Sequence, residues 1–111
     1  MQYDEFISHV QERAELDSRD DAVDITKATL GTLGERLYRT EREDLAAQLP
    51  DELKAYFTLE TAPRTSRKEI DAYGLEDFYV RVSARSDDLT VVQAIPKAQA
   101  VMQVLRSAIS A

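Results

Sequence analysis

The chain has 111 residues, no cysteine and a formal net charge of −7. This length suits one domain with one modest core, and the lack of cysteine excludes disulfides, thiolate metal sites and thiol nucleophiles. An acidic chain lacks the basic groups that displace counterions from phosphates, so we expect no nucleic-acid partner. The opening MQYDEF does not resemble a signal peptide, and no apolar run is long enough for a membrane span. We therefore expect a cytoplasmic protein without membrane contact.

The first two predicted helices span residues 2–15 and 19–38. Apolar residues at spacings of three and four give the first helix one buried face: Tyr3, Phe6, Ile7, Val10 and Ala14. Ser18 followed by Asp21 forms a capping-box pattern, which predicts the start of the second helix at Arg19. The inward positions expected in the second helix are Ala22, Thr26, Leu30, Leu33 and Leu37.

Two shorter helices are predicted at residues 41–48 and 50–57. Thr40 and Glu43 form a second capping-box pattern, and Pro50 is typical of a first helical turn. We expect these helices to close the core with Leu45, Leu49, Leu53, Tyr56 and Phe57. Residues 58–73 have the composition of a linker, in which Ser66 and Glu69 form a possible cap.

After the linker the sequence repeats itself. An offset of 72 residues aligns residues 3–37 with 75–109 without a gap, and this predicts helices at 75–86 and 91–109. The identical pairs are Phe6/Phe78, Val10/Val82, Arg13/Arg85, Ala22/Ala94, Ala28/Ala100 and Leu33/Leu105. The capping pattern recurs in register as Thr90 and Gln93, which indicates a duplicated helical hairpin.

The second copy differs from the first in two ways. Pro96 replaces Asp24, so we expect the last helix either to kink or to begin at Pro96. The copy also reaches Ala111 without a counterpart of residues 39–57. Its apolar seam should then be covered by cross-packing of the two hairpins or by another chain.

The expected fold is a single all-α domain over residues 1–111, a compact helical bundle built from two similar hairpins. The first repeat spans residues 3–57, residues 58–73 link the halves, and a truncated second repeat spans residues 74–111. The acidic excess lies entirely in the first repeat, where residues 1–57 hold 14 acids and 7 bases. Residues 74–111 hold 4 acids and 4 bases, so the second repeat is neutral.

The segments YDEFISHVQERAELDSRDDAV and TLGTLGERLYRTEREDLAAQLPDEL resemble the bacterial family known as domain of unknown function 2267. The resemblance covers residues 3–57 closely and residues 74–110 more loosely, and it depends mainly on LGERL followed by ED-LAAQLP-EL. It implies an all-helical fold made of two similar halves. It implies no activity, cofactor or catalytic residue.

Two features resemble parts of catalytic or metal sites, but their patterns favour surface roles. His9, the single histidine, is expected on the polar side of the first helix, and no G-x-S-x-G nucleophile pattern is present. The acidic run Asp17, Asp20, Asp21 and Asp24 lacks the D-x-D-x-D-G spacing of a calcium loop. Helix capping and dipole complementation explain the run, so no metal, cofactor or catalytic residue is predicted.

Basic residues form two further candidates. The turn from Gly34 to Glu43 has a helix-turn-helix pattern with Arg36, Arg39 and Arg42 as phosphate contacts. Acidic residues at the start of the following helix favour a solvated corner instead. Arg64, Arg67 and Lys68 form a possible anion or phosphorylation site, although short basic linkers are common.

The function favoured by the sequence is a non-enzymatic protein-interaction or regulatory module that holds a protein segment or a second copy of itself, as a homodimer, in an apolar groove between the hairpins. The alternative is a carrier of a small apolar ligand, and a DNA-binding helix-turn-helix is disfavoured. For either favoured function the expected groove residues are Phe6, Leu30, Leu33, Phe78, Met102 and Leu105.

Overall fold

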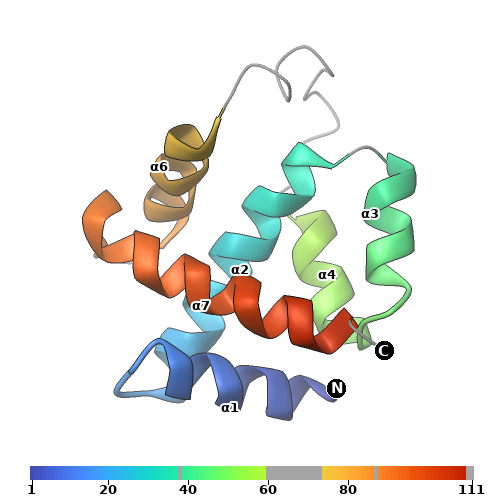
Figure 1. The fold of residues 1–111 in the computed structure, drawn as a ribbon, viewed down its shortest axis with the longest axis horizontal. Coiled ribbons are helices and arrows are strands. Elements are labelled where there is room, and N and C mark those ends of the chain that lie inside the picture. Colours follow the sequence, from blue (N-terminus) through green and yellow to red (C-terminus); the bar gives the residue numbers. More distant parts are fainter. Residues whose placement is uncertain (38, 60–73, 87, 110–111) are drawn as a thin grey trace.

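The computed structural model describes residues 1–37, 39–59, 74–86 and 88–109, which form six α-helices and no strand (Figure 1). In chain order the helices are α1 (Tyr3–Arg13), α2 (Arg19–Arg36), α3 (Arg39–Ala46), α4 (Asp51–Leu59), α6 (Leu75–Arg85) and α7 (Val91–Ile109). The predicted all-α bundle is confirmed. The proposed cap at Ser66 and the basic residues of the linker lie outside the described residues.

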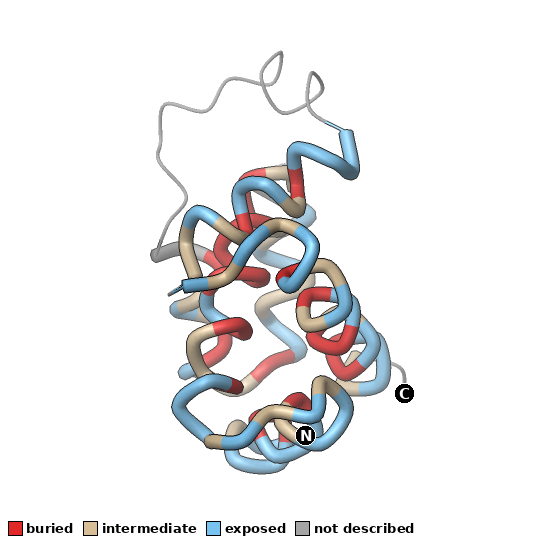
Figure 2. Tube along the Cα trace, turned by 90° about the vertical axis from the view of Figure 1, so that its left-hand side faces the viewer, coloured by how far each residue is buried: buried red, intermediate tan, exposed pale blue. Residues whose placement is uncertain are grey.

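Helix α2 is the central element of the bundle. α1, α4, α6 and α7 all pack against it, and ten of its 18 residues are buried (Figure 1). Small side chains allow these neighbours to approach from several sides, and the buried small residues are Ala22, Ala28, Gly31 and Gly34. A helix without a continuous polar stripe is typical of a buried position. In Figure 2 the buried stretches of the trace gather on the inner sides of the helices, and the exposed stretches lie on the outside.

Helix α4 covers one side of α2, and the leucines at every fourth position predicted that this part of the chain would close the core. Leu53 and Phe57 are fully buried and Leu49 nearly so, whereas Leu45 and Tyr56 are half-buried at the edge of the same core. Core closure by Phe57 is therefore confirmed. α3 packs on α4.

Helices α6 and α7 form a second pair whose bounds match those of the first pair. The 72-residue offset maps the ends of α1 onto the ends of α6, and it maps the start of α2 onto the start of α7. Both α6 and α7 pack on α2, and α7 also packs on α1. Helices α6 and α7 therefore pack on α1 and α2 of the same chain, which agrees with the cross-packing that we considered from the sequence, while the two-hairpin repeat itself stays a prediction.

The helix ends are fixed largely by local hydrogen bonds. α1 ends in a Schellman motif, in which Leu16 N–H donates to the Gln11 carbonyl (2.9 Å) and Glu15, with φ of 54°, donates to Glu12 (3.2 Å). The predicted cap of α2 is confirmed, since the Asp21 N–H donates to Ser18 Oγ at 3.1 Å.

The predicted capping box of α7 is confirmed in both directions. The Gln93 N–H donates to Thr90 Oγ1 at 3.2 Å, and the Thr90 N–H donates to Gln93 Oε1 at 3.0 Å.

None of the described helices combines the length and mean hydropathy needed to cross a bilayer.

One helix start was predicted wrongly. α3 begins at Arg39, so Thr40 lies inside the helix instead of capping it. The reason is a tertiary contact: Arg42 Nη1 donates to the carbonyl of Gly34 at 3.2 Å, which holds α3 against the end of α2. α7 begins at Val91, as the 72-residue offset predicted, and Pro96 lies inside it, so the start at Pro96 that we considered is not observed. Pro96 removes the N–H that would bond the Val92 carbonyl, but Val92 is exposed, so water can replace that bond.

Three buried threonines on α2 should respond in opposite ways to replacement by valine. The hydroxyls of Thr26 and Thr29 have no hydrogen-bond partner in the described structure, whereas Thr32 Oγ1 donates to Ala28 O (2.7 Å) and accepts from Arg85 (2.6 Å). We expect Thr26→Val to raise the free energy of unfolding by about 1 kcal/mol, because it removes an unsatisfied buried polar group. Thr32→Val should lower it by about 2 kcal/mol. Urea denaturation measures both, and equal effects would contradict this assignment.

Candidate functional site

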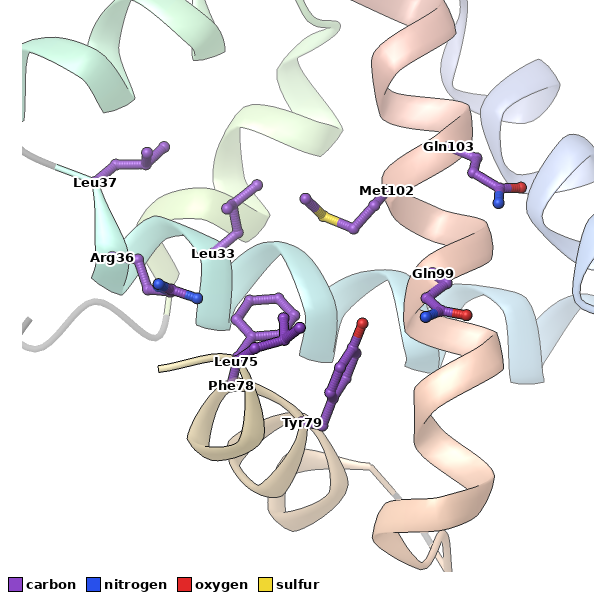
Figure 3. Close-up of a pocket in the computed structure, with 9 residues that line it drawn as sticks. All are labelled: Leu33, Arg36, Leu37, Leu75, Phe78, Tyr79, Gln99, Met102 and Gln103. Atoms are coloured by element: carbon purple, nitrogen blue, oxygen red, sulfur yellow. The ribbon is translucent and has the colours of Figure 1, made fainter. Parts of the chain in front are cut away.

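A groove of about 680 Å³ lies where α6 and α7 meet the C-terminal end of α2 (Figure 3). Each of the three helices contributes to its walls, and Figure 3 shows Leu33, Met102 and Tyr79 pointing into the same space. The lining residues are Leu33, Arg36 and Leu37 from α2 and its end, Leu75, Phe78 and Tyr79 from α6, and Gln99, Met102 and Gln103 from α7.

Phe78 is the best-buried of the lining side chains and two neighbours hold its ring. The Tyr79 ring meets it edge-on at a centroid distance of 5.6 Å, and the Arg36 guanidinium lies 5.8 Å from its centroid. Gln103, at the rim, accepts a hydrogen bond from Arg13 Nη1 at 3.0 Å. The groove therefore has an apolar interior, amide groups along one side and a cation at one end.

The rim of the groove is open to solvent. Leu75 is 62% exposed, and Gln99 and Gln103 are exposed as well. Leu75 is one of the few large apolar side chains on the described surface, and the others are Met1, Val80 and Val92. An exposed apolar side chain at the edge of an apolar depression is characteristic of a surface that binds another molecule.

The structure separates the six residues predicted for this groove into two sets. Leu33, Phe78 and Met102 line it. Phe6 and Leu30 are fully buried and Leu105 is 4% exposed, so these three belong to the core cluster. The same apolar spacing marks both sets, and only the position of the surrounding helices distinguishes them.

A buried ion-pair network fixes α6 to α2 beside the groove, and no sequence pattern predicted it. Glu35 is only 5% exposed; its carboxylate pairs with Arg85 and, at 3.5 Å, with Arg81. Arg85 Nη1 also donates to Thr32 Oγ1 at 2.6 Å. Burial lowers the pKa of the Arg85 guanidinium, whose charge Glu35 balances. The network sets the position of the α6 wall.

A tyrosine pair joins α1 to α4 in the first half of the chain. The hydroxyls of Tyr3 and Tyr56 lie 2.6 Å apart, and their rings meet edge-on with centroids 6.1 Å apart. Lys27 Nζ lies 5.8 Å from the centroid of the Tyr56 ring. Burial, followed by the hydrogen bond with Tyr3, raises the pKa of Tyr56 above its ordinary value. The phenol therefore stays protonated to a higher pH than a solvent-exposed tyrosine does.

Except for Arg36, which lines the groove, the other candidates lie apart from it. His9 is exposed beside a hollow of about 80 Å³ that Arg13 and Ser107 also line. In the described part of the chain, no three acidic or histidine side chains are grouped so as to hold a metal ion. Of the three arginines in the helix-turn-helix pattern, Arg36 lies over the Phe78 ring and Arg42 donates a hydrogen bond to the Gly34 carbonyl. The side chain of Arg39 is not among those that the structure describes.

Comparison with known proteins gave one finding. A family model described as "Uncharacterized conserved protein (DUF2267)" matches residues 3–111. No curated protein and no solved structure matched the chain.

Proposed function

The chain belongs to DUF2267, a family of uncharacterised conserved proteins, and from its own residues we propose that it is a non-enzymatic, cytoplasmic protein-interaction module. Its groove between α2, α6 and α7 holds apolar side chains of a partner protein. One observation carries this proposal: Leu75 is an apolar side chain that is largely exposed, and it lies at the edge of a mainly apolar depression. Binding would remove this side chain from water, which stabilises a complex by about 1.5–3 kcal/mol.

The chemistry of the lining supports recognition rather than catalysis. It offers an apolar surface, two amides, a phenol and one guanidinium. Guanidinium groups stay protonated and amides do not ionise, so these groups orient a bound molecule without exchanging protons with it. Proteins commonly place the apolar face of a helix in a groove of this kind, with polar contacts at its rim.

A small apolar ligand is the second candidate, and the volume of the groove favours it. About 680 Å³ falls within the range of roughly 300–1,000 Å³ typical of ligand pockets. Such pockets bury most of the ligand, however, and the exposed rim suits a larger partner better. Native mass spectrometry separates the two: a carrier is expected as a monomer with a small adduct, and an interaction module as a defined complex.

The proposal is tested by photo-cross-linking in the cells that naturally make the protein. A photoreactive phenylalanine analogue at position 75 should yield a discrete cross-linked protein, whereas the same analogue at position 92 should not. Val92 is the matched control, because it is an exposed apolar residue, 78% accessible, outside the groove. Leu75→Glu should weaken the complex roughly 10- to 100-fold, and Val92→Glu should leave it unchanged.

Three outcomes have distinct meanings. A cross-link to a second copy of this chain identifies a homodimer formed through the groove. Equal cross-linking from positions 75 and 92 contradicts a specific groove, and so does no product from position 75. Circular dichroism of both glutamate variants verifies that each one folds.

A further inference from the structure

The groove corresponds to a surface that another helix covers in the first half of the chain. Under the 72-residue offset, Leu75 matches Tyr3 and Gln99 matches Lys27. In the first half both of these positions contact the same residue of α4: the Tyr3 hydroxyl meets the Tyr56 hydroxyl at 2.6 Å, and Lys27 Nζ lies over the Tyr56 ring. The groove therefore lies where a counterpart of α4 would pack on α6 and α7.

Burial at the matched positions agrees with this correspondence. Leu30 and Ile7 are fully buried in the first half. Their counterparts, Met102 and Tyr79, are only half-buried and line the groove. Figure 1 shows α4 on one side of α2 and α6 on the other, and among the described helices α4 does not reach the groove. Among the described residues, no helix covers α6 and α7 here as α4 covers the first half, so the groove is a candidate site for a helix.

We infer that the groove takes a short helix of the α4 type from a partner protein. This inference rests on the proposed function. Such a helix carries a leucine and a phenylalanine four residues apart, as Leu53 and Phe57 are, with a second aromatic residue at the position of Tyr56. Its N-terminal turn is acidic, as Asp51 and Glu52 are in α4. An acidic turn complements the groove, because Arg36 is the one charged residue among the nine described lining residues.

The sequence of α4 itself supplies the probe. A peptide of residues 49–59, LPDELKAYFTL, presents Leu53 and Phe57 on one face. Peptides of this length are marginal helices in water, so a lactam bridge between Asp51 and Ala55→Lys should hold the helix. Both bridged positions are exposed in the protein, so the bridge leaves the apolar face intact, and because it makes Asp51 a neutral amide, Glu52 is the remaining acid of the first turn.

We expect amide NMR signals of the groove to shift when this peptide is added to the intact protein. Phe57→Ala in the peptide and Leu75→Glu in the protein should each weaken binding roughly tenfold or more. Glu52→Gln in the peptide should weaken it about two- to fivefold, which is the usual size of an exposed charge contact. Val92→Glu in the protein should have no effect.

The possible failures point to different errors. Two results would overturn the inference of an α4-type helix and leave the proposed interaction module in place. In the first, the peptide shifts only signals from the site where α4 packs on α2. In the second, the peptide causes no shifts, yet position 75 still cross-links to a partner in cells. No peptide binding together with no cross-linked partner would overturn both proposals.

Discussion

Replacing Glu35 by alanine should lower the free energy of unfolding by about 3–5 kcal/mol. This carboxylate is buried and pairs with both Arg81 and Arg85 of α6. Its removal takes this counter-charge from the guanidinium of Arg85, which is only 22% exposed. Breaking a buried pair on one side typically costs this much, because the remaining charge loses a close opposite charge in a poorly solvated position. Urea denaturation at neutral pH measures the change.

The matched control is another ion pair of good geometry. Asp4 and Arg19 lie 2.6 Å apart, yet their side chains are 84% and 48% exposed. Water screens this pair, so Asp4→Ala should cost at most about 1 kcal/mol. If the two substitutions have equal effects, Glu35 does not bind α6 to α2 in the way we describe. Glu35→Ala should also weaken binding in the groove, because it releases the α6 wall.

Replacing Phe57 by alanine should lower the free energy of unfolding by about 3–5 kcal/mol. The ring is fully buried where α4 packs on α2, and its loss leaves a cavity that the surrounding helices cannot fill. Tyr56→Phe, one residue earlier, removes only the hydroxyl that meets Tyr3. That change should lower the free energy of unfolding by about 1 kcal/mol, which is the net contribution of one hydrogen bond.

Thermal or urea unfolding of both variants provides the comparison. A loss below about 1 kcal/mol for Phe57→Ala would show that α4 is not anchored through this ring. A large loss for Tyr56→Phe would instead place the anchor at the tyrosine pair.

The helices were predictable because their ends carry local signals. Ser18 and the Thr90–Gln93 pair act within one turn of the residues they cap, so sequence spacing alone locates these starts. Thr40 carries the same pattern and does not cap its helix. The deciding contact there is the hydrogen bond from Arg42 to Gly34 on the preceding helix, and a capping pattern does not include it.

The candidate site was only partly predictable, because burial depends on which helix covers a residue. Leu30 and Met102 occupy matched positions in similar patterns, yet the first is in the core and the second lines the groove. Glu35 has the sequence neighbourhood of an ordinary surface glutamate. Its partner Arg85 is 50 residues away, so no short-range pattern connects the two.

The central position of α2 also determines how the protein folds. A helix that is buried on several sides gains most of its stability from packing, so it is not stable until its neighbours have folded against it. Two of those neighbours, α1 and α4, are close to α2 in sequence, but α6 and α7 come from the other half of the chain. The two halves therefore share a single cooperative unit, and the chain should melt in one all-or-none transition despite its repetitive sequence. Calorimetry or urea denaturation followed by two probes checks this, and two separate transitions would contradict it.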